Sequence, residues 1–200
     1  MTNQITTGLK SGQGTMAAGE LIVIRHGMTV SPDRLNGRTD VALAEPPNPV
    51  VLVPTALWAS PAIRAQDTAT GLFPGVELRA DERLWEQDFG AIDGTPFRDL
   101  PDIGVLSKAD LADLRAKGGE NFHDMVARAE PALREAAMLA RGADGPVVLV
   151  AHAGIVRVAL AMAMGNAAAA LSFQISYLGA TRLTCYASGF AVTAVNEQLF

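Results

Sequence analysis

Residues 21–27 read Leu-Ile-Val-Ile-Arg-His-Gly, an apolar run that ends in two basic side chains and a glycine. An unbroken apolar run of this length is typical of a parallel strand that is covered on both faces. Two further runs have the same character, Ala56 to Ala59 and Val147 to Ala151. Polar residues and then a segment with helical spacing follow each of these two runs. The alternation predicts an α/β fold with a mostly parallel sheet.

Helices and a closing hairpin are predicted from spacing and composition. Ala62 to Leu72 and Gly154 to Met164 are rich in alanine and leucine-type helix formers. From Glu120 to Arg141 apolar residues recur at intervals of three and four, which predicts the longest helix, and Pro131 should kink it. The tail from Ser172 to Val195 alternates apolar and polar positions, which predicts an antiparallel hairpin. We therefore expect a three-layer sandwich whose sheet has one antiparallel edge.

The chain has the length and composition of one domain with a large core. Its 200 residues are 49% apolar and only 18% charged, which excludes disorder of the whole chain. Residues 1–19 are polar and lack the apolar run of a secretory signal, so we expect them to form a disordered extension. Residues 20–200 should form the domain, and residues 95–117 should form a small helical cap over its pocket.

Charge and cysteine content exclude several classes of partner. A formal net charge of -5 leaves no basic field to hold a nucleic acid. The stretches 46–63 and 158–173 are uncharged, but prolines interrupt the first and Gly165 interrupts the second, so neither predicts a membrane span. Cys185 is the only cysteine and cannot form an internal disulfide, which fits a reducing, cytoplasmic location. No sequence feature indicates a particular oligomeric state.

Basic side chains follow all three apolar runs. Arg25 and His26 come directly after the first run, Arg64 follows the second and His152 follows the third. Ligands of open α/β sheets bind beyond the carboxyl ends of the strands, so we expect these four side chains to converge on one pocket. Arginine forks match tetrahedral oxyanions, and a neutral imidazole can act as a nucleophile. The set predicts a site for a phosphate monoester, a small-molecule partner.

Metal and nucleotide-loop sites are the competing interpretations. Two histidines without a cysteine partner or a short His spacing fall short of the three or four ligands of a zinc site. Neither of the two glycine-rich phosphate-loop patterns occurs in the chain. We therefore predict a site that uses no metal and no cofactor.

Four sequence blocks together resemble the histidine phosphatase superfamily, the group that includes the phosphoglycerate mutases. The likeness runs from Leu21 to about Asn196 and so covers essentially the whole domain. The blocks are Arg25-His26-Gly27, Ser60-Pro61-Ala62-Ile63-Arg64-Ala65-Gln66-Asp67-Thr68-Ala69, Leu84-Trp85-Glu86-Gln87-Asp88-Phe89-Gly90 with Asp93-Gly94, and Val150-Ala151-His152-Ala153-Gly154.

The resemblance implies a role for each matched residue. His26 would be the nucleophile that becomes phosphorylated. Arg25, Arg64 and His152 would hold the phosphate, and Glu86 would donate a proton to the leaving group. The implied activity is hydrolysis of the phosphomonoester of a small metabolite through a phosphohistidine. If Glu86 does not serve as the acid, Asp93 is the next candidate.

Two departures from the family pattern affect the predicted site and fold. Pro32 stands where the family usually has an asparagine that touches the phosphate, so Ser31, Asn36 or a backbone N–H would have to replace it. The proline-rich segment from Glu45 to Pro54 occupies a region where the family commonly has a helix. We expect that helix to be shortened or missing.

Two residues outside the four matched blocks, His123 and Arg98, also have a predicted location or role. His123 should lie on the surface of the long helix, without a titratable partner. Arg98, in the predicted cap, is a candidate second contact to substrate.

Alternative functions remain open from the sequence. Mutase activity would need a longer cap than residues 95–117 offer. Among phosphatases, Gly37-Arg38-Thr39-Asp40 and the short chain are similar to the α-ribazole phosphatase group. A non-catalytic phosphate-binding module is the alternative from a different class.

Overall fold

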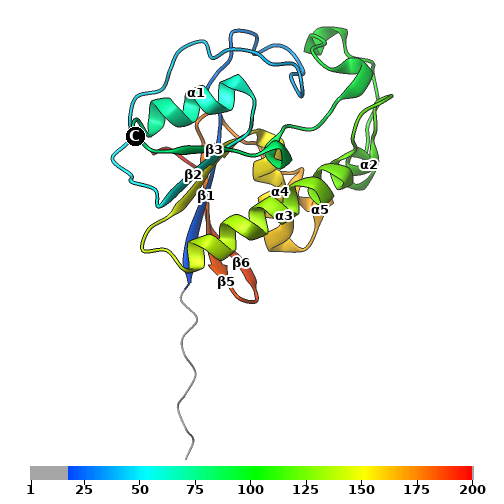
Figure 1. The fold of residues 1–200 in the computed structure, drawn as a ribbon. Helices are drawn as coiled ribbons and strands as arrows, with labels where there is room; N and C mark the ends of the chain where they lie inside the picture. Colours follow the sequence, from blue (N-terminus) through cyan, green and yellow to red (C-terminus); the bar gives the residue numbers. More distant parts are fainter. Residues whose placement is uncertain (1–17, 200) are drawn as a thin grey trace, which may run out of the picture.

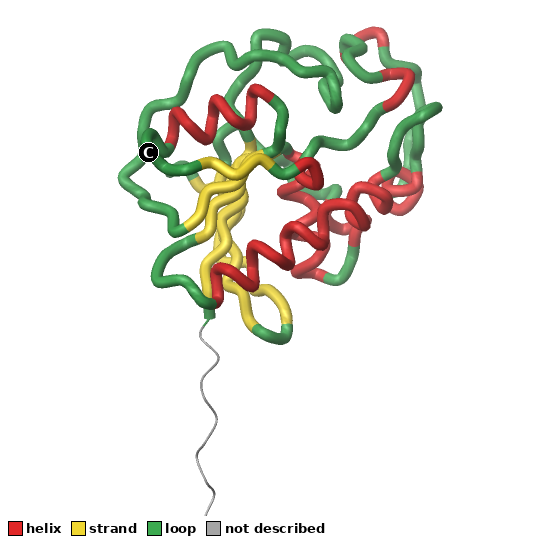
Figure 2. The backbone as a smooth tube through the Cα atoms, in the orientation of Figure 1, coloured by secondary structure: helices red, strands yellow, loops and turns green. Residues whose placement is uncertain are grey.

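A six-stranded sheet forms the centre of the computed structural model, which describes residues 18–199 (Figures 1 and 2). The strand order is β3-β2-β4-β1-β5-β6. The first four of these strands run parallel, while β5 and β6 are antiparallel, so the predicted sheet type is confirmed. The elements are β1 (Gly19–Arg25), β2 (Ala56–Ala59), α1 (Ile63–Leu72), β3 (Leu78–Ala80), η1 (Glu82–Leu84), η2 (Gly90–Ile92), η3 (Phe97–Asp99), α2 (Lys108–Asp113), α3 (Phe122–Arg141), β4 (Val147–Ala151), α4 (Ala153–Met164), α5 (Ala167–Ala170), β5 (Ala180–Tyr186) and β6 (Gly189–Glu197).

Apolar side chains of the central strands face two separate cores. Leu21 and Val23 of β1 belong to the core beneath α3, α4 and α5, whereas Ile22 and Ile24 belong to the core beneath α1. Successive side chains of a strand point to opposite faces, so a run of four apolar residues buries both faces at once. Helices accordingly lie on either side of the sheet in Figure 1.

The predicted helices and the predicted hairpin are present with small shifts at their ends. Helix α3 begins at Phe122 because Asn121 and Asp124 form a reciprocal capping box, and it continues through Pro131 as one element. The hairpin consists of β5 and β6, but residues 172–179, which were predicted to belong to it, form a loop. Strand β3 was not predicted, because three residues are too few to show a period.

The first strand begins one residue before the predicted start of the domain. Gly19 was assigned to the disordered extension but belongs to β1 and pairs with Cys185. A Cβ atom on Gly19 would lie 2.2 Å from the carbonyl of Ala140. The start of β1 therefore packs directly on the C-terminal end of α3, and a larger residue would not fit there. Residues 1–17 of the predicted extension lie outside the described residues.

The segments around the sheet edge have little regular structure. Residues 45–54 contain no helix, in agreement with the prediction, and they are tied to the domain by a hydrogen bond from the Val50 N–H to the Leu72 carbonyl. The predicted cap, residues 95–117, contains only η3 and the six-residue α2, and most of it is exposed. Within residues 18–199, no helix combines the length and the apolar character that crossing a membrane requires.

Candidate active site

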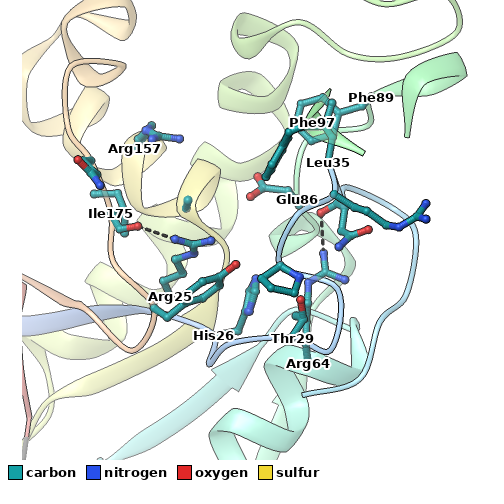
Figure 3. A pocket seen from close by; sticks show the side chains of 16 residues that line it. Arg25, His26, Thr29, Leu35, Arg64, Glu86, Phe89, Phe97, Arg157 and Ile175 are labelled. Carbon is teal, nitrogen blue, oxygen red and sulfur yellow. Dashed lines mark hydrogen bonds between the residues drawn. The ribbon is translucent and has the colours of Figure 1, made fainter. Parts of the chain in front are cut away.

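A pocket of about 430 Å³ opens at the carboxyl ends of the parallel strands (Figure 3). Arg25 is the last residue of β1 and His26 follows it, while Arg64 lies on the first turn of α1, just after β2. Glu86 comes from the segment after η1. All four side chains line this pocket, so the structure brings together four of the five residues that the sequence singled out.

The imidazole of His26 is buried and oriented by a single hydrogen bond. Its Nδ1 lies 2.7 Å from the carbonyl oxygen of Gly27, so this nitrogen carries the proton and donates it. The lone pair therefore remains on Nε2. Burial, helped by the charges of Arg64 and Arg25, lowers the pKa of His26 to about 3. The ring is neutral at physiological pH, which is the state that a nitrogen nucleophile requires.

Arg25 is fixed by the loop that precedes β5. Its Nη1 donates to the carbonyl of Ile175 at 2.6 Å, and its guanidinium carbon lies 3.7 Å from the centre of the Tyr177 ring. The Nε atom is buried and has no hydrogen-bond partner among the described residues. An unpaired buried donor at the wall of a pocket is suited to an anionic ligand.

Arg64 is fully buried and is held by the backbone of residues 36–39, which we call the 36–39 loop. Its Nη1 donates to the carbonyl of Thr39, and its Nη2 donates to the carbonyls of Asn36 and Gly37 at 3.2 and 2.8 Å. The Nε atom is buried without a partner among residues 18–199. The loop thus fixes the plane of the guanidinium and leaves Nε free to donate.

Asp93 binds the opposite side of the same 36–39 loop. Its Oδ2 accepts the N–H of Arg38 at 2.7 Å, while its Oδ1 accepts the N–H groups of Thr39 and Gly37 at 3.0 and 3.3 Å. Although burial raises the pKa of Asp93, the hydrogen bonds from Thr39 and from the loop backbone bring it below its usual value. Asp93 does not belong to the pocket lining, whereas Glu86 does, so Asp93 is the poorer candidate for the acid.

His152 lies behind the pocket rather than in its lining. The residue is fully buried, its ring centre lies 5.2 Å from that of His26, and its Nε2 is 2.8 Å from the hydroxyl oxygen of Ser60. Its Nδ1 has no partner among the described residues. Burial and the neighbouring charge of Arg64 hold the pKa of His152 well below its usual value.

The carboxylate of Glu86 is oriented by two backbone N–H groups. Oε1 accepts from Gln87 at 3.0 Å, and Oε2 accepts from Gly154, on the first turn of α4, at 3.2 Å. A carboxylate is favoured at a helix N-terminus because the exposed N–H groups there carry partial positive charge. Glu86 therefore faces the pocket in a defined orientation.

The residues near Pro32 decide what could replace the phosphate-contacting asparagine that the family usually has at this position. Pro32 and Asn36 both line the pocket, but the Nδ2 of Asn36 donates to the Ser31 carbonyl and its Oδ1 is buried without a partner. An amide NH₂ carries two donors, so one N–H of Asn36 is left for a phosphate, whereas Ser31 does not belong to the lining. Thr29, three residues after His26 and only 3% exposed, does line it and was missed.

Arg98 does not reach the pocket, so its prediction as a substrate contact was wrong. Its side chain is 81% exposed and lies 3.7 Å from Asp99, whereas the neighbouring Phe97 lines the pocket. Consecutive residues of a 3₁₀ turn point in different directions, and only one of the two can face inward. His123 is exposed on α3 as predicted, but its Nε2 lies 3.5 Å from Asp113, a partner that the sequence did not reveal.

Arg157 is the main site residue that the sequence analysis missed. It lies on α4, lines the pocket and is half-buried, and its Nε donates to the carbonyl of Phe173 at 3.0 Å. No carboxylate within the described range forms an ion pair with it. Its position five residues after His152 and four after Ala153 was the available signal, because residues four apart share one face of a helix.

The donor chemistry of the pocket does not suit a metal ion. Within the part of the chain that the structure describes, no three His, Cys, Asp or Glu side chains are grouped so that they could hold one. The positive charge of the pocket comes from arginines, among them Arg25, Arg64 and Arg157.

This chain belongs to the histidine phosphatase superfamily, branch 1, whose family model matches residues 52–198. The matched range includes Arg64, Glu86 and His152, while Arg25 and His26 lie before it. The chain is 31% identical over 164 residues to a glucosyl-3-phosphoglycerate phosphatase of Mycobacterium tuberculosis, covering 70% of this chain and 73% of that protein. It is accordingly a phosphatase of this superfamily.

Two further comparisons extend the likeness. A solved structure of a mycobacterial glucosyl-3-phosphoglycerate phosphatase superposes with a TM-score of 0.77 at 26% identity, covering 90% of this chain and 100% of that one. A 6-phosphofructo-2-kinase/fructose-2,6-bisphosphatase of Caenorhabditis elegans is 31% identical over 109 residues, which are 52% of this chain and 23% of that protein. The predicted family and fold class are confirmed.

Proposed function

We propose that this protein hydrolyses the phosphomonoester of a small metabolite through a phosphohistidine on Nε2 of His26. The observation that carries the proposal is the state of this ring: neutral, buried, with its proton fixed on Nδ1 and two arginines beside it. In the first step Nε2 attacks phosphorus in line with the departing oxygen. The free Nε donors of Arg25 and Arg64 hold the other phosphate oxygens, and His152 supports the His26 ring from behind the pocket.

Glu86 serves both steps of this reaction. It protonates the departing alkoxide in the first step, because an alkoxide is a poor leaving group. In the second step its carboxylate takes a proton from the water that attacks the phosphohistidine. Water then replaces the N–P bond with a P–O bond, inorganic phosphate leaves, and the free His26 ring is regenerated. The arginine side chains, rather than a metal ion, balance the negative charge of the phosphoryl group.

The substrate class follows from the part of the pocket beyond the phosphate. Arg157 is an unpaired, half-buried cation within the described residues, and the aromatic rings of Phe89 and Phe97 line another part of the pocket. The cavity of about 430 Å³ exceeds what a phosphate group needs. We infer a phosphorylated hydroxy acid, free or glycosylated, whose carboxylate pairs with Arg157. The mycobacterial relatives are named for glucosyl-3-phosphoglycerate, which has these groups.

Phosphate release from a panel of monoesters tests the substrate class. The panel contains glucosyl-3-phosphoglycerate, 3-phosphoglycerate, α-ribazole 5′-phosphate and p-nitrophenyl phosphate. We expect the two carboxylate-bearing esters to give the highest kcat/KM. Fastest turnover of the α-ribazole ester would contradict the carboxylate assignment and favour the α-ribazole phosphatase group instead.

Trapping of the intermediate tests the mechanism. Wild-type protein quenched during turnover should carry acid-labile, base-stable phosphate, as a phosphoramidate does, and His26→Ala should carry none and be inactive. Acid-labile phosphate on the His26→Ala variant would contradict the assignment of His26 as the nucleophile. Absence of turnover with every ester, together with tight phosphate binding, would instead indicate a binding module.

A further inference from the structure

Arg128 lies on the inner side of α3, and all of its N–H donors form hydrogen bonds. Some bind the backbone of the segment that bears Glu86, and the others bind the carboxylate of Glu120. Its Nε donates to Oε1 of Glu120 at 2.7 Å, and its Nη2 donates to Oε2 of the same side chain at 2.8 Å. Its Nη1 donates to the carbonyls of Arg83 and Trp85 at 2.8 and 3.1 Å, and Nη2 also donates to the carbonyl of Glu86 at 3.2 Å. A guanidinium has five N–H donors, so none is left for a ligand.

Glu120 extends this contact to the residues after Glu86. Its Oε2 accepts the N–H of Asp88 at 3.1 Å, and its own N–H donates to the carbonyl of Asp88 at 2.8 Å. Its carbonyl accepts from the side chain of Gln87 at 2.8 Å. The Arg128–Glu120 pair therefore binds the backbone on both sides of Glu86.

The bound segment has no regular structure of its own to hold it. Helix η1 ends at Leu84, and residues 85–89 belong to no helix or strand. The position of the Glu86 carboxylate depends on where this backbone lies. Arg128 itself does not line the pocket, so it has no direct access to substrate.

We propose that Arg128 is a positioning residue for the general acid, acting through the backbone of residues 83–88. The inference rests on the proposed function, because it needs Glu86 to be the acid. Three carbonyls and one carboxylate converge on Arg128, and the planar fork of arginine satisfies all of them. Lysine has three donors on a single nitrogen and cannot span these acceptors. Loss of the fork would leave these partly buried carbonyls unpaired and free the segment to shift.

The leaving group distinguishes positioning of the acid from a general structural role. An alkyl phosphate needs protonation of its leaving oxygen, whereas p-nitrophenyl phosphate, with its acidic phenol, needs it much less. We expect Arg128→Lys and Arg128→Gln to lower kcat for an alkyl ester by about 10- to 100-fold and to lower kcat for p-nitrophenyl phosphate by less than about threefold. KM for both esters should change little, because Arg25 and Arg64 are untouched.

A matched control is available on the same helix. Arg134 lies on the exposed face of α3, where its side chain pairs with Glu130, so Arg134→Gln should leave both rates unchanged. Because Arg128→Gln leaves Glu120 with only the more distant Arg38, at 4.0 Å, as a cationic partner, it is compared with Arg128→Gln/Glu120→Gln. Arg128→Lys keeps the charge and tests the fork alone if the glutamine variants do not fold. Circular dichroism and thermal melts establish folding before the kinetics.

Glu86→Gln separates failure of this inference from failure of the proposed function. It should slow the alkyl ester by about 10²- to 10⁴-fold and, combined with Arg128→Lys, should show no further selective loss. If Glu86→Gln is selective for the alkyl ester but the Arg128 variants slow both esters equally, the inference is overturned and the proposed function stands. If Glu86→Gln slows both esters equally, the acid assignment itself is overturned.

Discussion

The carboxylate of Glu86 occupies the space in which a side chain at Gly154 would begin. A Cβ atom on Gly154 would lie 2.1 Å from Oε1 of Glu86, well inside contact distance. The same glycine supplies the N–H that Oε2 of Glu86 accepts. A single helical position thus both donates to the proposed acid and makes room for it.

Gly154→Ala should therefore reduce catalysis without unfolding the protein. Alanine favours a helix over glycine by about 1 kcal/mol, but its Cβ would also lie 2.7 Å from the buried Met125 side chain, so the melting temperature should change little. The Glu86 side chain must move, and kcat for an alkyl phosphate should fall by at least about tenfold, with a smaller effect on p-nitrophenyl phosphate. Gly142→Ala, whose Cβ would meet nothing closer than 3.8 Å, is the control. Unchanged turnover of alkyl esters by Gly154→Ala would contradict the tight contact.

Asp93→Asn should weaken phosphate binding without a leaving-group effect. The carboxylate binds the N–H groups of the 36–39 loop, whose carbonyls hold Arg64, so its loss should misplace that guanidinium. We expect the inhibition constant of inorganic phosphate to rise by about 5- to 30-fold, equivalent to roughly 1–2 kcal/mol. Asp99→Asn, in the exposed part of residues 95–117, is the control. A selective loss with alkyl esters would instead show that Asp93 acts as the acid.

Arg157→Gln should discriminate between substrates with and without a carboxylate. Loss of a charge-assisted pair costs roughly 1.5–3 kcal/mol, so kcat/KM for 3-phosphoglycerate should fall by about 10- to 100-fold. Turnover of p-nitrophenyl phosphate, which has no carboxylate, should change by less than about threefold. The exposed Arg98→Gln serves as a control of the same chemistry. Equal losses with both substrates would place Arg157 in a structural role or at the phosphate.

Stability should decrease as the pH falls from 7 to 5. His26 and His152 are buried in the neutral form, and burial lowers the pKa of each below its ordinary value, to about 3 for His26. Below pH about 6.5 the unfolded chain binds protons that the folded chain does not, so the free energy of unfolding falls until the folded pKa is reached. The loss between pH 7 and 5 should amount to up to about 2 kcal/mol for His26, and His152 should add to it in the same direction.

Urea unfolding at the two pH values measures this dependence. His26→Gln should show a shallower decrease than the wild type. A slope in His26→Gln as steep as that of the wild type would contradict a neutral, buried His26.

Removal of divalent cations should leave activity unchanged. The positive charge around the proposed phosphate site is supplied by Arg25 and Arg64. Steady-state rates with EDTA and after dialysis should match those of untreated protein. A loss that Mg²⁺ or Zn²⁺ restores would contradict the metal-independent mechanism.

The amino-acid sequence alone was sufficient to predict the central strands and the edge at which the site lies. The runs at Leu21, Ala56 and Val147 are apolar at every position because both faces of each strand are buried, and that pattern is local. Arg25, His26 and Arg64 follow such strands within a few residues, so their approach to one another follows from parallel pairing. The antiparallel tail was predicted from a different but equally local pattern, the alternation of apolar and polar residues along a short stretch.

Only the tertiary structure decided which side chains face the ligand and what holds them. Arg157 lines the pocket and Arg98 does not, because the direction of each side chain depends on how α4 and the 3₁₀ turn η3 are placed. Arg128 and Glu86 are 42 residues apart, and no local pattern encodes the hydrogen bond between them. Contacts of this kind arise from packing between distant segments, which is why strands and motifs could be predicted before the geometry that supports them.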